Sequence, residues 1–458
     1  MATRKGIRAA SPPDARIPEG PGGGTGDGTG VRTTGRFIVI FKEDAAADRA
    51  TIRSTMKRVA GVQNLAASAD YEGGAASAED MAKGEAVQFN HLGVVVMSGE
   101  DAMQALSASA SDTGSPILAV EPEYIAYHSR LPDEAIALQY LRGYRDAVNH
   151  VYDQLSRQEV DQEQGAAISA LLQDTDQLTW GLQATRVSTS SRNGQGIKVA
   201  ILDTGLDLQH PDFRGRQIVS ESFVAGISTA QDIHGHGTHC VGTACGPQRP
   251  ASGVRRYGVA FGSQIFVGKV FDNKPEPEAA TGDVLAGIEW AITNGCRVVS
   301  LSLGIPINQK VDQYEEPIRR ALNAGTLVVA AAGNNAERPR RPGFVEPPAN
   351  ADAAMAVAAV DSRLRIAEFS ARSSQLTGVG GIVNIAGPGV AVFSSVPGGH
   401  DAFSGTSMAT PHVAGIAALW AQATGESGPA LWNRLLQTTR PLSLPSLDVG
   451  SGLIQAPQ

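Results

Sequence analysis

Four near-continuous apolar runs, which alternate with stretches of helical character, constrain the fold of this chain from Trp180 onward. The runs cover residues 197–202, 264–271, 298–303 and 326–332. Strands that are buried on both faces of a parallel sheet have this pattern, because neither face carries polar side chains. Helical patterns at 283–293 and 314–324 lie between the runs. We therefore predict an α/β fold with a doubly wound parallel sheet, helices on both faces, and functional groups at the carboxyl ends of the strands.

Composition excludes several classes of protein. At 458 residues the chain exceeds one ordinary domain, and 42% hydrophobic residues provide ample core material. The formal net charge of −8 gives nucleic acid no broad basic face. No stretch approaches the roughly 20 apolar residues of a membrane span. We expect a monomeric protein with no nucleic-acid or membrane partner.

The cysteines and the N-terminus bear on the cellular compartment. Cys240, Cys245 and Cys296 are too few for a disulfide framework, and their odd number fits a reducing compartment or buried thiols. Residues 1–35 are rich in Gly, Pro and Thr and have no apolar segment of the kind found in secretory signals. We predict a disordered tail over 1–35, and a protein that is cytoplasmic or exported by a non-Sec route.

Two further regions precede the predicted parallel sheet. Residues 36–129 predict a small α+β domain with strands at 37–41, 87–89, 92–96, 117–120 and 124–127 and helices at 48–62 and 101–110. Apolar residues between 141 and 155 then recur at steps of three and four, which is typical of an amphipathic helix. We interpret 130–175 as a helical linker rather than a partner-binding helix, so the parallel-sheet domain spans 176–458.

Two motifs provide a candidate carboxylate and a candidate base. Asp203 ends the run 197–202, where it either caps the next turn or serves chemistry at a strand end. The segment 234–240 contains three histidines and Cys240, residue types that zinc prefers. No second ligand group with finger-like spacing accompanies it, so we predict no metal there. His236, which has glycines on both sides, is favoured as a catalytic base.

Two further motifs provide a candidate nucleophile and a hydrogen-bond donor. Ser407 precedes the apolar helical run 413–421, where it is either an N-cap or a nucleophile beside the free N–H groups of a helix N-terminus. Such a serine needs a base held by a third group, roles that His236 and Asp203 can fill. Asn334 follows the run 326–332 and is either a turn residue or an oxyanion donor.

With these motifs in the order Asp203, His236, Asn334, Ser407, the chain resembles the subtilisin-like serine proteases (subtilases, peptidase family S8). The sequences of its motifs are most similar to those of the proteinase K branch. The resemblance covers about residues 176–456 and implies a serine endopeptidase. It implies that Asp203 orients His236, that His236 transfers protons, and that Ser407 forms the acyl-enzyme. Asn334 and the backbone N–H of Ser407 would hold the oxyanion.

The resemblance also implies a groove for a polypeptide substrate, which would pair between two backbone segments. The edge segment is matched by Ser302, Leu303 and Gly304, and the opposite wall by Ala331, Ala332 and Gly333. These small residues predict a broad, apolar preference at the substrate residue before the scissile bond. The pocket floor is expected within 336–349.

Residues 36 to about 128 resemble the inhibitory I9-type propeptide of this family, a ferredoxin-like domain whose tail, here 120–128, lies across the active site. The chain would then be a zymogen with its own propeptide as partner, cleaved near 128–130 or near 174. No cofactor is required by the resemblance. Asp212 matches a calcium ligand of the family, but the loop 246–257 lacks carboxylates and Asn384 replaces an acidic ligand. We therefore predict no strong calcium site.

Two alternatives to a zymogen protease remain open at this point. A peptide ligase or macrocyclase shares the acyl-enzyme but excludes water, and the chain lacks the capping insertion expected for one between His236 and Ser407. A permanently propeptide-inhibited binding module would keep the same fold without activity. For Cys240, we favour a buried small residue over a regulatory thiol.

Overall fold

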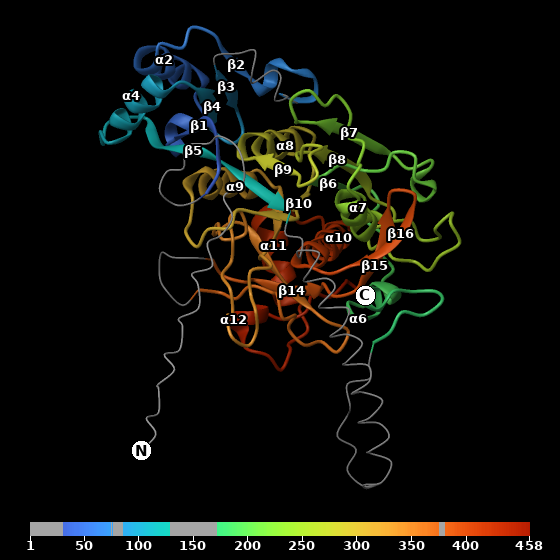
Figure 1. The fold of residues 1–458 in the computed structure, drawn as a ribbon. Helices are drawn as coiled ribbons and strands as arrows, with labels where there is room; N and C mark the ends of the chain where they lie inside the picture. Colours follow the sequence, from blue (N-terminus) through green and yellow to red (C-terminus); the bar gives the residue numbers. More distant parts are fainter. Residues whose placement is uncertain (1–30, 75, 77–85, 129–171, 375–380) are drawn as a thin grey trace, which may run out of the picture.

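The computed structural model describes residues 31–74, 76, 86–128, 172–374 and 381–458. Within these ranges a small N-terminal unit rests on a larger α/β unit (Figure 1). Most of the predicted tail (1–35) and linker (130–175) lies outside the described residues. Their inner boundaries were wrong: residues 33–35 belong to the first strand, and Leu172 packs on the larger unit, where its N–H donates to Ser362 O at 3.3 Å.

The larger unit is built on a seven-stranded sheet in which every neighbouring pair is parallel. In spatial order its strands are β14 (Ile385–Pro388), β13 (Met355–Val360), β12 (Leu327–Ala331), β10 (Val298–Leu301), β6 (Lys198–Asp203), β8 (Gln264–Lys269) and β7 (Ile218–Ser222). The predicted doubly wound α/β fold is confirmed. Asp203 is the last residue of β6, which lies between β10 and β8 in the sheet.

Both faces of this sheet are covered by helices, as the apolar runs predicted (Figure 1). One face packs on α7 (His236–Cys245) and α10 (Thr406–Thr424), and the other on α8 (Thr281–Thr293) and α9 (Asp312–Asn323). Alternate residues of β6 serve the two faces. Val199 and Ile201 join the α7 and α10 core, whereas Ala200 and Leu202 join the α8 and α9 core.

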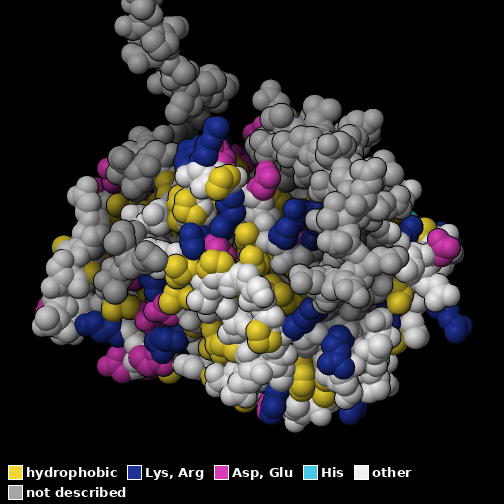
Figure 2. Space-filling view, turned by 90° about the horizontal axis from the view of Figure 1, so that it is seen from below, with side chains coloured by type: hydrophobic (Ala, Val, Ile, Leu, Met, Phe, Trp, Pro, Cys, Tyr) yellow, Lys and Arg dark blue, Asp and Glu magenta, His cyan; other side chains and the backbone are white. Residues whose placement is uncertain are grey.

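Short elements complete the larger unit. They are η3 (Val187–Thr189), η4 (Pro211–Phe213), α6 (Trp180–Ala184), α11 (Gly428–Gln437), α12 (Ser446–Val449), the strands β9 (Glu278–Ala280) and β11 (Leu303–Gly304), and the hairpin β15 (Val392–Val396) and β16 (Gly399–Phe403). On the face opposite the N-terminal unit, basic and acidic side chains are interspersed with apolar ones (Figure 2). None of the helices in the described ranges combines the length and apolar character that crossing a bilayer requires.

The N-terminal unit is the predicted α+β domain. Its elements are β1 (Thr33–Phe41), β2 (Leu65–Ala67), β3 (Ala86–Phe89), β4 (Val94–Ser98), β5 (Ile117–His128), α1 (Glu43–Ala46), α2 (Arg49–Ala60), α4 (Glu100–Ala110), η1 (Ser68–Asp70) and η2 (Glu72–Gly74). The sheet order is β5-β1-β4-β3-β2. One prediction was wrong: the two closing strands form the single strand β5. A register shift in the β1–β5 pairing, next to Pro122, accommodates the missing N–H of the proline.

The N-terminal sheet lies between two helical layers. Phe37 and Val39 of β1 pack toward α2 and α4, while Ile38 and Ile40 pack toward the core that contains α8 and α9. The chain therefore stacks five layers: α2 and α4, the N-terminal sheet, α8 and α9, the parallel sheet, and α7 and α10. This stacking places the N-terminal unit against α8 and α9, and the end of β5 extends from it to β11 and β9 of the larger unit.

Charged groups of α8 and α9 also bind the N-terminal unit. Glu289, which is 1% exposed, accepts hydrogen bonds from the backbone N–H groups of His91 (3.0 Å) and Leu92 (3.2 Å) and from Ser68 Oγ (2.7 Å). The Arg320 guanidinium donates to the carbonyl oxygens of Leu92 and Phe41. These buried charges are hydrogen-bonded, as burial requires.

The first turns of α8 and α9 are bound by carboxylates of β5. Glu123 accepts from the Gly282 N–H at 2.7 Å, and Glu121 accepts from the Asp312 and Gln313 N–H groups at 3.0 and 2.8 Å. Both carboxylates satisfy amides that have no partner within their helix and lie at its positive end. β5 is thus held along its length before it reaches the larger unit's strand ends.

We predict that Leu202→Ala destabilises the fold. The Leu202 side chain is fully buried, and a Cβ atom on Gly268 or Gly287 would lie only 2.4 or 2.9 Å from its methyl groups. Truncation would leave a cavity that costs about 2–5 kcal/mol in the free energy of unfolding. Denaturant unfolding in a Ser407→Ala background measures it. The control Leu118→Ala removes a 39% exposed side chain and should change stability by less than about 0.5 kcal/mol; equal losses would contradict the packing described.

Candidate active site

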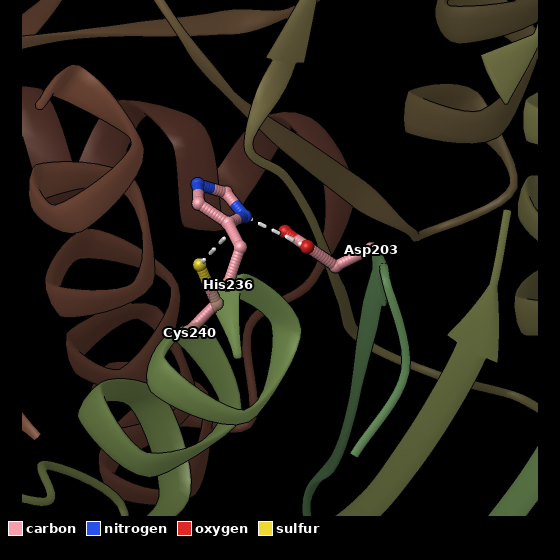
Figure 3. Close-up of side chains that lie close together, drawn as sticks. All are labelled: Asp203, His236 and Cys240. Carbon is pink, nitrogen blue, oxygen red and sulfur yellow. Dashed lines mark hydrogen bonds and ion pairs between the residues drawn. The ribbon is translucent and has the colours of Figure 1, made fainter. Parts of the chain in front are cut away.

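Asp203 and His236 meet at the carboxyl end of β6. Asp203 is fully buried, and His236, the first residue of α7, is 5% exposed. His236 Nδ1 lies 2.8 Å from Asp203 Oδ1 (Figure 3). The preceding residue, Gly235, has a φ of 94°, a conformation that favours glycine, so the chain can turn sharply into α7. Within the described part of the chain, His236 Nε2 has no hydrogen-bond partner.

A second buried carboxylate, Asp232, organises the loop before His236. Its Oδ1 accepts from the N–H groups of His234 (2.8 Å) and Gly235 (3.0 Å), and its Oδ2 accepts from Thr238 N (2.9 Å) and Oγ1 (2.6 Å). Burial opposes ionisation of Asp232, but these hydrogen bonds keep its pKa below the ordinary value. The sequence reasoning missed Asp232. Its position four residues before His236 was the available signal.

Ser407 lies in the first turn of α10 and is fully buried. Its Oγ lies 3.4 Å from Ser302 O, and Ser302 Oγ donates to Ser407 O at 2.9 Å. The helix start predicted for Ser407 is confirmed. The structure thus places the serine beside Ser302, while the described contacts of His236 Nδ1 are to Asp203 and the Cys240 sulfur.

Asn334 follows β12 and points its side chain at the start of α10. Asn334 Oδ1 accepts from Thr406 N and Thr406 Oγ1, each at 2.9 Å. Thr406 Oγ1 in turn accepts from Gly333 N at 3.2 Å. Because Thr406 binds the oxygen of the amide, Nδ2 is the end of the Asn334 side chain that can donate. These hydrogen bonds fix the orientation of the Asn334 side chain beside Thr406, the residue that precedes Ser407.

The end of β5 lies between two short strands beside these residues. On one side, His128 and Tyr127 pair antiparallel with Leu303 and Gly304 of β11. On the other side, residues 125–127 pair antiparallel with β9 (Glu278–Ala280). A central chain with strand partners on both sides is the arrangement of β-strand addition.

The two predicted walls of this groove differ in their pairing with β5. The predicted edge segment, Ser302 to Gly304, does pair with β5, but the segment that pairs on the other side is β9. Ala332 N donates instead to Val357 O at 3.1 Å, and Gly333 N donates to Thr406 Oγ1. Ala331 lies in β12 and pairs with Val357 of β13. β9 has only three residues and no apolar run, so its pairing was not visible in the sequence.

His128, the last described residue of β5, covers the His236 ring. The two rings stack with centroids 5.1 Å apart and planes at 22°. His128 also contacts Phe271, in an edge arrangement with ring centroids 5.8 Å apart. The side chain of His128 thus covers one face of the His236 ring.

The side chains around Asp212 do not fit a calcium ion. Asp212 accepts hydrogen bonds from Ser252 N (2.9 Å), Tyr257 OH (2.7 Å) and His400 Nε2 (2.8 Å). His210 Nε2 is bonded to Gly399 O at 2.9 Å. Calcium binds oxygen ligands, whereas these neighbours are donors that already saturate the carboxylate. Asn384 is also engaged, because its Oδ1 accepts from Ala356 N at 2.7 Å.

Comparison with known proteins identifies the family. The model of the Subtilase family (Peptidase S8) matches residues 194–451. An alkaline protease of Alkalihalobacillus alcalophilus is 36% identical over 336 residues, which cover 71% of this chain and 82% of that protein. Subtilisin Savinase of Lederbergia lenta is 37% identical over 282 residues, covering 60% and 96%. The structure of Sphericase aligns with a TM-score of 0.54 and 28% identity, over 61% of this chain and 99% of that one.

The fold defines the class of subtilisin-like serine proteases. The chain belongs to the subtilase family, and it is a serine endopeptidase.

We predict that the three thiols are unreactive in the folded protein. All three are buried, and burial raises the pKa of Cys240 and Cys245 and raises that of Cys296 to about 12. Iodoacetamide at pH 8 should therefore label none of them in folded Ser407→Ala protein and all three after denaturation, as read by mass spectrometry. A positive control is Ser111→Cys, at an exposed position after α4, which should label at once. Rapid labelling of native Cys240 would contradict the prediction.

Proposed function

We propose that this subtilase is made as a self-inhibited zymogen, and that the N-terminal unit is its inhibitory propeptide. The observation that carries the proposal is the position of β5. Its last residues pair with β11 and β9 as an extended substrate would, and His128 stacks on His236. The bound peptide and the protease are one chain, so inhibition begins as soon as the chain folds.

We assign the catalytic roles as follows. The Nδ1–H of His236 donates to the Asp203 carboxylate, which keeps Nε2 unprotonated and able to accept a proton. For catalysis the Ser407 hydroxyl turns from Ser302 O to Nε2, transfers its proton and attacks the substrate carbonyl. His236 then protonates the leaving amine, and water releases the acyl group by the same route in reverse.

The oxyanion is bound by two donors in this proposal. One is Nδ2 of Asn334, oriented because Thr406 occupies the oxygen of the same amide. The other is the backbone N–H of Ser407, in the first turn of α10, where amides have no partner within the helix. Every group comes from one chain, so a monomer or a propeptide–enzyme complex suffices, and neither a cofactor nor a metal takes part.

Self-cleavage tests the zymogen proposal. We expect the purified wild-type chain to split between residues 125 and 176, and intact mass to reveal both fragments. Ser407→Ala should stay whole, since it lacks the nucleophile. A fluorophosphonate probe should label the processed wild type at Ser407 and leave the alanine variant unlabelled.

Two outcomes would overturn this proposal. Equal splitting of both proteins would show that the cleavage has another source. A wild type that labels and digests peptides while remaining whole would show that the N-terminal unit does not inhibit. Ser111→Ala, which removes an exposed hydroxyl after α4 rather than the nucleophile, is the matched control and should still self-cleave.

Removal of the oxyanion donor should slow the chemical step. We predict that Asn334→Ala lowers kcat by about 10²–10³ with little change in KM, a magnitude taken from subtilisin itself, where one such donor has that effect. Steady-state kinetics with a peptide substrate measures both constants. A raised KM with unchanged kcat would mean that Asn334 only supports the groove.

A further inference from the structure

The buried carboxylate of Glu346 lies outside the proposed catalytic machinery, yet beside the substrate groove. Its backbone is fixed, because Glu346 N donates to Ala332 O and Asn350 N donates to Glu346 O, each at 3.1 Å. The residue is 8% exposed, and Oε1 accepts from Asn335 Nδ2 at 2.7 Å. Among the described residues, no Lys or Arg forms an ion pair with it. Buried carboxylates ordinarily have such a partner.

The carboxylate occupies space that two glycines leave open. A Cβ atom on Gly304 would lie 2.4 Å from Glu346 Oε2, and one on Gly333 would lie 3.1 Å from Glu346 Cδ. Gly304 ends the edge segment that pairs with β5, and Gly333 ends the segment from Ala331. Glu346 therefore lies between the two segments that were expected to wall the substrate pocket.

The strand register identifies the substrate residue that faces this carboxylate. Tyr127 pairs with Gly304 and His128 with Leu303, so the next position of a bound peptide lies opposite Ser302. Ser407 Oγ is 3.4 Å from Ser302 O, which makes that position the one whose carbonyl Ser407 attacks.

The alternation of side chains along a strand then determines on which face of the peptide the side chain of the attacked residue lies. Residues directly opposite in an antiparallel pair share a face, and so do residues two apart on one strand. The side chain of the attacked residue therefore lies on the face of Gly304 and Tyr127, and His128 lies on the other face against His236. The Gly304 face is where Glu346 lies.

We propose that Glu346 is a specificity-determining residue that selects Lys or Arg at the substrate position whose carbonyl is attacked. The inference rests on the proposed function and replaces the broad apolar preference expected from the sequence. A cationic side chain would give the carboxylate the partner that it lacks, through a charge-assisted hydrogen bond. An apolar side chain would desolvate the carboxylate without compensating it.

The titration of Glu346 gives this preference a pH dependence. Burial raises its pKa to about 7, against the opposing effect of the Asn335 hydrogen bond. In the described part of the chain, the carboxylate contacts Gly304, Gly333 and Asn335, and neither these residues nor its own segment 344–350 contains another ionisable side chain. The carboxyl is ionised above about pH 7 and neutral below it, whereas lysine stays cationic throughout. Preference for lysine should therefore rise with pH.

The test uses protein that is produced as the full-length chain and has then processed itself. The substrates are fluorogenic peptides that differ only at the attacked residue, which is Lys, Arg, Leu or norleucine. We expect wild type to have the higher kcat/KM for Lys and Arg. Glu346→Gln, which keeps the shape, should lower these values by about 10- to 100-fold and leave Leu and norleucine unchanged or raised. Glu221→Gln on the edge strand β7 removes the same charge elsewhere and should change nothing.

The pH profile of the wild type provides a test that no folding defect can obscure. The ratio of kcat/KM for Lys over norleucine should rise between pH 6 and 8, since any effect of pH that is common to both substrates cancels in the ratio. A flat ratio, or faster cleavage after Leu than after Lys, overturns the role of Glu346. Loss of all hydrolysis together with loss of fluorophosphonate labelling of the wild type would instead refute the proposed function.

Discussion

The pairing of the end of β5 with β11 and β9 is the interaction on which the arrangement of the active-site region depends. β11 has two residues and β9 has three, too few to form a stable sheet alone. Among the described residues their strand partner is β5, so the three strands form a small sheet with the peptide at its centre. Main-chain hydrogen bonds are indifferent to sequence, and they can therefore hold an inhibitor and a substrate in the same register.

The two faces of the peptide in this groove meet different chemistry. One face meets the flat rings of His236 and Phe271. The other face meets Gly304, and the Glu346 carboxylate lies behind that glycine. Backbone pairing provides affinity, and the alternating side chains are recognised separately on each face. Binding and selectivity thus come from different groups of the protein.

Much of the fold and part of the site could be predicted because they follow from local patterns. Asp203 ends an apolar strand and Ser407 begins an apolar helix, so each was recognisable from its own neighbours. β9 was not, because three residues form a strand only when a partner lies beside them. Glu346 was not either, since its neighbour Gly304 is 42 positions away in the sequence. In place of β5 the sequence predicted two strands separated around Pro122. The structure keeps one strand, because a shift in its pairing with β1 accommodates the missing N–H of the proline.

The buried charges between the two units have a consequence for what remains when the units separate. Glu289 and Arg320 stay on α8 and α9, as do the amides that Glu121 and Glu123 had bound. These groups hydrate readily, and they are spread among the apolar side chains that the N-terminal sheet had covered. The newly uncovered face is therefore wettable, and it does not present the continuous apolar patch through which proteins stick to one another.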